Sequence, residues 1–415
     1  MKTLLGAGCA VVLAVAAEAA ATQGAKVTFT KDVAPILYNR CIECHRAGEV
    51  APMSLLTYQD VRPWAKAIKE RVLERRMPPW LADPRYGHFE NDRRLSQAEL
   101  DTIAAWVDAG APKGEDRDLR PAPQMEPGWV MGKPDAVIYL ESDVEVQAEG
   151  VVPYQYYTVP INFTEDRWIQ AAEIRPGNRA VVHHIIVNVL DPGTEYTART
   201  GTQADASGRR GFKLAGFAPG EQPKVWPTGT AKLVKAGSKF VFQVHYTPNG
   251  KPATDRSYIG LLFAKEPVKH KVQTGTAINA GFKIPPGDPS HEVRSSWTAK
   301  EDVRIVDLMP HMHLRGKDFT YTAVYPDGRS EIVLQVPKYD FNWQLLYRFR
   351  EPLLIPKGGR LDCVAHFDNS PNNKWNPDPG KEVKWGPQTW EEMMIGWFDY
   401  ISIGGAVQTT GDGNQ

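Results

Sequence analysis

The sequence predicts a multidomain chain in which a small all-α domain precedes two all-β sandwich domains. Three observations support this fold class. The 415 residues, 42% of them hydrophobic, suffice for two or three cores. Helical spacing of apolar side chains is confined to residues 27–112, and short strands with period two follow from residue 135. The 35 glycines and 33 prolines indicate a loop-rich, mostly β protein.

The first 21 residues have the pattern of a secretory signal peptide. Lys2 gives a positive start, an apolar run follows, and small residues at 19–21 suit signal-peptidase cleavage. A membrane anchor is the alternative, but the run is short and Glu18 interrupts it. We therefore expect a periplasmic or secreted protein with a signal peptide over 1–21 and no transmembrane segment in the mature chain.

Charge and cysteine content exclude several classes of protein. The 49 basic and 49 acidic side chains balance, so nothing indicates nucleic acid or an anionic membrane surface as a partner. Removal of the signal peptide leaves Cys41, Cys44 and Cys363. An exported chain with three cysteines is not a disulfide scaffold.

The segment "CIECH", residues 41–45, has the spacing of covalent haem attachment. Cys41 and Cys44 are one helical turn apart and can reach the two vinyl groups of one porphyrin, and His45 can then ligate the iron. The alternatives are a redox dithiol and half of a zinc site, but the zinc site has only His88 nearby as a further ligand. We expect one covalent haem c.

The flanking residues predict helices around this motif. "FTKDVAPILYNRC" and "TYQDVRPWAKAIKERVLERR" are amphipathic, and Ser96 with Glu99 forms a capping box before a last helix. Met77, directly after the second of these segments, suits the second axial position of the haem, with Met53 as the rival. Residues 27–112 resemble a small class I cytochrome c domain. The Pro- and Gly-rich residues 113–134 then form a linker.

The strands after residue 135 predict two β-sandwiches in series, over residues 135–265 and 266–405. "YPDG" at 325–328 predicts a hairpin turn. The Gly-, Thr- and charge-rich residues 192–225 predict a long loop.

Histidines in the strand patterns suggest metal sites. In "VDLMPHMHLRG", His311 and His313 are two residues apart and face the same way on a strand, so they can hold one ion. A soft third ligand would favour copper, and Met393 and Met394 are the candidates.

A second candidate group lies nearer the middle of the chain. His183 and His184 are neighbours and point to opposite faces of a regular strand, so both reach one ion only where the backbone bends or the rings turn back. His245, in "FQVHY", supplies a third imidazole, and three histidines suit copper or zinc.

The segments "VVHHI", "FQVHY", "PHMHLRG" and "TWEEMM" follow in an order and spacing that resemble the copper type II, ascorbate-dependent monooxygenases, such as peptidylglycine α-hydroxylating monooxygenase and dopamine β-monooxygenase. The resemblance covers about residues 140–405 and implies two jelly-roll-like domains with one copper each. It implies that His183, His184 and His245 hold an electron-transfer copper. His311, His313 and Met393 would hold the copper that binds O2. Met393 is preferred to Met394 because "EEM" matches the family's acidic pair.

The chain departs from the peptidylglycine enzymes where those bind a substrate carboxylate. Met309 stands in place of their arginine, and Ile395 and Trp397 stand in place of an asparagine and a tyrosine. These side chains favour an apolar or aromatic small substrate over a carboxylate.

Together these features predict an exported copper-dependent monooxygenase. It would hydroxylate a C–H bond with O2, and a periplasmic donor would supply electrons through the fused haem to two coppers. The alternative is a non-catalytic periplasmic protein for electron transfer or copper handling.

Overall fold

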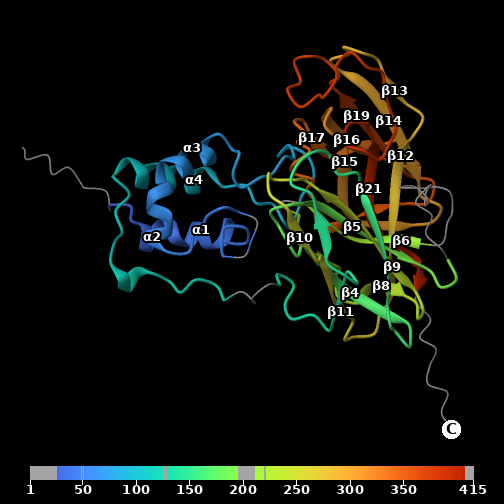
Figure 1. Cartoon of the computed structure of the whole chain (residues 1–415), viewed down its shortest axis with the longest axis horizontal. Coiled ribbons are helices and arrows are strands. Elements are labelled where there is room, and N and C mark those ends of the chain that lie inside the picture. The colour runs from blue at the N-terminus through green and yellow to red at the C-terminus, as the bar shows by residue number, and fades with distance from the viewer. Residues whose placement is uncertain are drawn as a thin grey trace, which may run out of the picture.

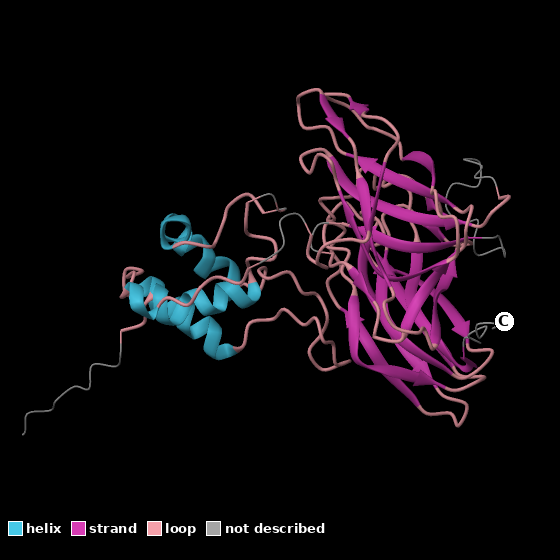
Figure 2. Ribbon diagram, turned by 90° about the horizontal axis from the view of Figure 1, so that it is seen from below, coloured by secondary structure: helices cyan, strands magenta, loops and turns pink. Residues whose placement is uncertain are grey.

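The computed structural model describes residues 26–47, 49, 51–124, 129–194, 211–218 and 221–406. A group of helices lies at one side of the molecule and a larger body of strands at the other (Figures 1 and 2). The chain is mostly β, with sandwich-like sheets. The predicted signal peptide, residues 1–21, lies outside the described residues.

The helices occupy the N-terminal part of the chain. Their bounds are η1 Phe29–Val33, α1 Ala34–Arg40, α2 Tyr58–Val61, η2 Arg62–Trp64, α3 Ala65–Leu73, α4 Gln97–Asp108 and η3 Asp116–Asp118. The capping box that the sequence predicts is present: Ser96 Oγ accepts from Glu99 N, and the Glu99 carboxylate accepts from Ser96 N. Gly110 follows α4 with φ +85°, as a helix C-terminus requires.

The helical core is small and continuous. It is built around Phe29, Leu37, Val61, Ile103 and Trp106, which are all fully buried. The spacing of these side chains is what the amphipathic patterns predict.

In the first half of the β body, residues 135–265, the described ranges contain eleven strands. These are β1 Ala136–Tyr139, β2 Val144–Val146, β3 Gln155–Pro160, β4 Arg167–Arg175, β5 Val182–Leu190, β6 Gly211–Phe217, β7 Lys224–Val225, β8 Thr230–Val234, β9 Lys239–Tyr246, β10 Ala253–Asp255 and β11 Tyr258–Phe263. β3-β9-β5-β6 form one sheet and β1-β11-β4-β8 belong to another, with an apolar core between them. Residues 211–217 form β6, paired with β5, so the prediction of one loop over 192–225 is wrong there.

The second half has ten strands. These are β12 His270–Asn279, β13 Lys283–Ile284, β14 His291–Thr298, β15 Val303–His311, β16 Gly316–Val324, β17 Ser330–Val336, β18 Tyr347–Ile355, β19 Arg360–Phe367, β20 Val383–Lys384 and β21 Met394–Ala406. β14-β19-β16-β17 form a sheet opposite β12-β21-β15-β18. The predicted turn at 325–328 joins β16 to β17, with Gly328 at φ +86°.

One sheet runs through both halves of the β body. β8 of the first half pairs in parallel with β12 of the second, so the order is β1-β11-β4-β8-β12-β21-β15-β18. The predicted boundary at 265/266 falls between β11 and β12, inside this shared sheet. Because backbone hydrogen bonds cross the boundary, the two halves are held at a defined separation.

Several contacts between described residues fix the helical unit, residues 27–112, to the β body. Trp80 and Phe89 pack in the core of the second half, where their rings contact Tyr347. The Glu49 carboxylate, in the loop after the Cys-x-x-Cys-His motif, pairs with Arg175 at 2.9 Å and with Arg179 at 3.1 Å. Residues 27–112 thus contribute to two cores rather than one.

The end of the predicted linker lies along the first half of the β body. The N–H groups of Val130 and Met131 donate to Glu173 at 2.8 and 3.0 Å, and the Trp129 ring packs on Tyr258. Within the described ranges, no helix has the length and apolar character needed to cross a membrane.

Candidate metal centres

The first histidine group is assembled by a β-bulge. His184 on β5 lies opposite His245 on β9, and the register between these strands shifts between Val182 and His184. His183 is the extra residue in this irregularity. A bulge re-aims one side chain of a strand, which lets neighbouring residues turn to one side. This is the backbone irregularity that two adjacent histidines need in order to reach one ion.

The three imidazoles of this group fit a metal ion. One ligand atom from each of His183, His184 and His245 lies within 4.8 Å of the others, and the two Nδ1 atoms of His183 and His184 are 3.2 Å apart. Among the described residues, His245 Nδ1 is buried without a hydrogen-bond partner. Burial lowers the pKa of His245 to about 3, so the ring is neutral at pH 7. Neutral imidazole is the form that binds metal.

The second histidine group lies at the end of β15. His311 is the last residue of the strand, and His313 follows two residues later. Met312 between them is completely buried in the core of the second half. The alternation places His311 and His313 on the opposite side of the strand from that core, and their ring centroids are 5.2 Å apart.

Each of these two rings is held through Nδ1. His311 Nδ1 lies 2.7 Å from Gln344 Oε1, and His313 Nδ1 lies 3.2 Å from the Glu391 carbonyl oxygen. Such contacts orient metal-binding histidines and leave Nε2 free. Within the part of the chain that the structure describes, His313 Nε2 is buried and has no partner. These rings fit a second metal ion.

Strand register separates Met393 from Met394. His311 pairs with Ile395 across β15 and β21, so Ile395 faces the histidine side. Met393, two residues earlier, shares that side by alternation. Met394 points the other way, into the core of the second half, where its sulfur accepts from Ser295 Oγ at 3.1 Å. The geometry therefore favours Met393 as the thioether ligand.

A buried carboxylate joins the two chain segments of this group. Glu392 is completely buried, and its oxygens accept from His313 N at 2.8 Å and from Arg315 N at 2.6 Å. It thereby ties the His-x-His segment to the residue before Met393. In the sequence, Glu392 is recognisable only as part of an acidic pair. Its hydrogen-bond partners could not be predicted, because they depend on the fold.

Tyr154 is a further residue that the sequence did not indicate. Its ring lies 5.2 Å from the His184 ring and 4.8 Å from the His245 ring, by centroids. Its hydroxyl is buried and has no hydrogen-bond partner among the described residues. Burial raises the pKa of this hydroxyl far above the usual range, so it stays a phenol and a potential donor beside the first group.

The Cys-x-x-Cys-His motif forms a turn after α1. Cys44 N and His45 N both donate to the Cys41 carbonyl oxygen, at 3.2 and 2.9 Å. Both thiols are free and half-buried, and burial raises the pKa of Cys41 to about 12, which does not suit a reactive dithiol. His45 Nδ1 lies 3.2 Å from the Met53 carbonyl oxygen, leaving Nε2 for an axial bond. This arrangement fits a covalent haem.

A cavity of roughly 1710 Å³ lies between the helical unit and the β body. Cys41, Cys44, His45, Met53 and Met77 all line it. Met53 belongs to the loop that contacts His45, whereas Met77 follows α3, on a separate segment. Both thioethers line the cavity, and Met77 would be the one to ligate the iron on a segment separate from that of His45.

The same cavity reaches the first histidine group, because His183 and His245 also line it. A cavity of this size exceeds the usual range for drug-sized ligands, about 300–1,000 Å³, and has room for a large planar group. The Cys-x-x-Cys-His motif and the first histidine group therefore line the same cavity.

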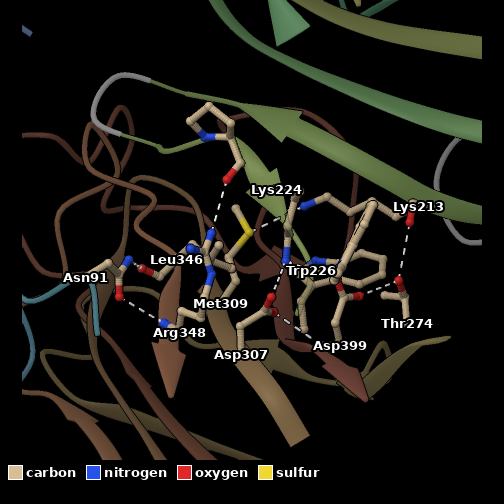
Figure 3. A network of polar contacts seen from close by, with 12 residues as sticks. Asn91, Lys213, Lys224, Trp226, Thr274, Asp307, Met309, Leu346, Arg348 and Asp399 are labelled. Atoms are coloured by element: carbon tan, nitrogen blue, oxygen red, sulfur yellow. Dashed lines mark hydrogen bonds and ion pairs between the residues drawn. The ribbon is translucent and has the colours of Figure 1, made fainter. Parts of the chain in front are cut away.

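The side chains expected to face a substrate lie beside the second group. Met309 pairs with Trp397 across β15 and β21, next to the pair of His311 with Ile395. The structure adds the buried ammonium group of Lys213, which lies 3.4 Å from Met309 Sδ (Figure 3). The same group lies 5.3 Å from the Trp397 ring centroid. The surroundings of these apolar residues are therefore less apolar than the sequence suggests.

Lys213 belongs to a buried charged network between the two halves of the β body (Figure 3). Lys224 pairs with Asp307 at 2.7 Å and with Asp399 at 3.2 Å, and Lys232 pairs with Asp399 at 3.0 Å. Because the lysines come from the first half and the aspartates from the second, the network holds the halves together.

Comparisons with known proteins give no family for the chain. No family model matches it, and no curated protein matches it. Among solved structures, PNGF-II is similar at 10% identity with a TM-score of 0.25 over 60% of this chain and 59% of that one. The major capsid protein P2 from bacteriophage PM2 is similar at 10% identity with a TM-score of 0.28, over 66% of this chain and 99% of that one. The chain spans about three-fifths of the length of PNGF-II.

Proposed function

We propose that this protein is an exported copper-dependent monooxygenase, which hydroxylates a C–H bond of a small substrate with O2 and receives electrons through a covalently attached haem c. One observation carries the proposal: the Cys-x-x-Cys-His turn and two histidines of the first group line one cavity. The two histidine groups would supply the metal ligands, since among the described residues His245 Nδ1 and His313 Nε2 are buried without a hydrogen-bond partner.

When bound, the haem and the copper ions would supply electron transfer and oxygen activation. Cys41 and Cys44 would tether the porphyrin, with His45 and Met77 as axial ligands. His183, His184 and His245 would hold one copper, and His311, His313 and Met393 the other. The thioether of Met393 favours the reduced ion.

The chain's own contribution is to hold these ligands. Gln344 and the Glu391 carbonyl set the orientation of His311 and His313, and Glu392 keeps Met393 beside them. Met309 and Trp397 present an apolar surface to a substrate, with the Lys213 ammonium at its edge. The Glu49 ion pairs keep the helical unit in place.

A second function is a non-catalytic periplasmic protein for electron transfer or copper handling. One observation favours it: His183 and His245 line the large cavity, whereas His311 and His313 are 8% and 1% exposed. A second group so enclosed suits storage of an ion as well as its use in catalysis. Product formation distinguishes the two functions.

The test is expression of the mature chain in a periplasm that matures c-type cytochromes, followed by measurement of iron and copper per chain. We expect one iron and two coppers, and we expect O2 to reoxidise the reduced haem only in copper-loaded protein. Met393→Ala should keep the haem and slow this reoxidation. Reoxidation at one rate with and without copper would refute the proposed electron supply.

A further inference from the structure

A single loop supports both histidine groups. Residues 337–346 connect β17 to β18, and this loop follows the edge of the large cavity. Its side chains contact both groups, although the two groups are far apart in the sequence. The inference drawn from these contacts rests on the ligand assignment of the proposed function.

The Phe341 side chain of the loop contacts the first group. The Phe341 ring is stacked on the His183 ring, with centroids 5.1 Å apart and planes 10° from parallel. Asn342, the next residue of the loop, lines the same cavity as His183. The loop therefore restricts the orientation of His183.

Other contacts of the loop reach the second group. The edge of the Phe341 ring meets His313, with centroids 6.0 Å apart and planes 86° apart. Gln344 Oε1 lies 2.7 Å from His311 Nδ1, and the Tyr339 hydroxyl contacts the Met312 backbone at 2.9 and 3.1 Å. Phe341 is thus one ring in contact with a histidine of each group.

We propose that Phe341 is a positioning residue that couples the two histidine groups, so that metal bound at one group changes the affinity of the other. A metal ion fixes the rotation of His183 or His313, and the shared ring transmits that restriction through direct packing. The first ion to bind already restricts the conformational freedom of these rings. The second ion therefore binds with a smaller loss of conformational entropy, which gives positive coupling. This inference deepens the proposed function, since it concerns the same two groups.

The test measures Cu(I) affinity of the first group by competition with a chromophoric chelator, in the full-length haem-containing chain. Met393→Ala removes the thioether of the second group without touching the loop. In the wild type, we expect this change to lower first-group affinity about three- to thirtyfold, the range typical of coupled sites. In a Phe341→Leu background, the same change should leave first-group affinity nearly unaltered.

Two further variants separate coupling from stability. The quantity compared is the ratio of first-group Cu(I) affinities with and without the Met393→Ala change. Phe341→Tyr keeps the aromatic ring and should keep the wild-type value of this ratio. Trp375→Leu alters another aromatic side chain of the same cavity, 57% exposed, and should also keep the ratio. A merely structural role for Phe341 would weaken affinity with and without Met393 by the same factor.

The outcomes are distinct. A ratio near one in the wild type, or an equal ratio in wild type and Phe341→Leu, would overturn the coupling while leaving two copper sites in place. If neither group bound copper, the proposed function would fall, and the coupling with it. If the ratio collapsed in Phe341→Leu alone, the assignment of Phe341 would stand.

Discussion

Removal of the buried Glu392 carboxylate should destabilise the protein and selectively empty the second metal group. The two carboxylate oxygens accept from the N–H groups of His313 and Arg315, at 2.8 and 2.6 Å. Each buried N–H left without a partner costs about 1–3 kcal/mol. Glu392→Ala orphans both and should lower the free energy of unfolding by about 2–6 kcal/mol. Glu392→Gln keeps one acceptor oxygen and should cost about 1–3 kcal/mol.

The assay combines urea unfolding with copper analysis. We expect a lower denaturation midpoint for Glu392→Gln, and retention of the first copper with loss of the second, because only one of the two hydrogen bonds that tie the His313 segment to the residue before Met393 remains. Glu391→Gln is the matched control, since its carboxylate is only half-buried and accepts one local N–H from Gln388. Wild-type stability and two bound coppers in Glu392→Gln would refute the reasoning.

Three further changes test the ligands and the buried network. Met393→Ala should lose one of two coppers, whereas Met394→Ala should keep both and lose about 2–5 kcal/mol of stability through the cavity it leaves in the core; equal copper loss in both would contradict this assignment. Met77→Ala should remove the absorption band of thioether-ligated ferric haem, and Met53→Ala should retain it; the reverse result would make Met53 the ligand. Burial lowers the pKa of Lys232 to about 8 from 10.5. Between these pH values the unfolded chain therefore binds more protons than the folded one. The difference in unfolding free energy between wild type and Lys232→Met should rise with pH across that window. A difference that does not change with pH would contradict the lowered pKa of Lys232.

Local pattern accounts for much of what the sequence predicted. Helical spacing and the Ser96 capping box predicted the helical part, and period-two alternation predicted the strands. The turn at 325–328 was evident because its residues suit a tight turn. Each of these features depends on interactions between residues close in the chain, so a single sequence carries them.

The sequence also named the histidines and cysteines that the structure brings together, because their spacing on a strand or a helical turn is itself informative. For that reason His311 and His313 share a face of the strand, and Cys41 and Cys44 lie in one turn. Imidazole and thioether ligands then indicate metal ions that prefer nitrogen or soft sulfur donors.

Only the tertiary structure decided how distant segments meet. The bulge that turns His183 beside His184 exists because β5 pairs with β9. Met394 rather than Met393 points into the core, and Ile395 pairs with His311, because of the register between β15 and β21. Phe341 reaches both groups because one loop passes between two sandwich halves that share a sheet. Pairing register and packing between remote strands arise from the whole core, and no local spacing in the sequence encodes them.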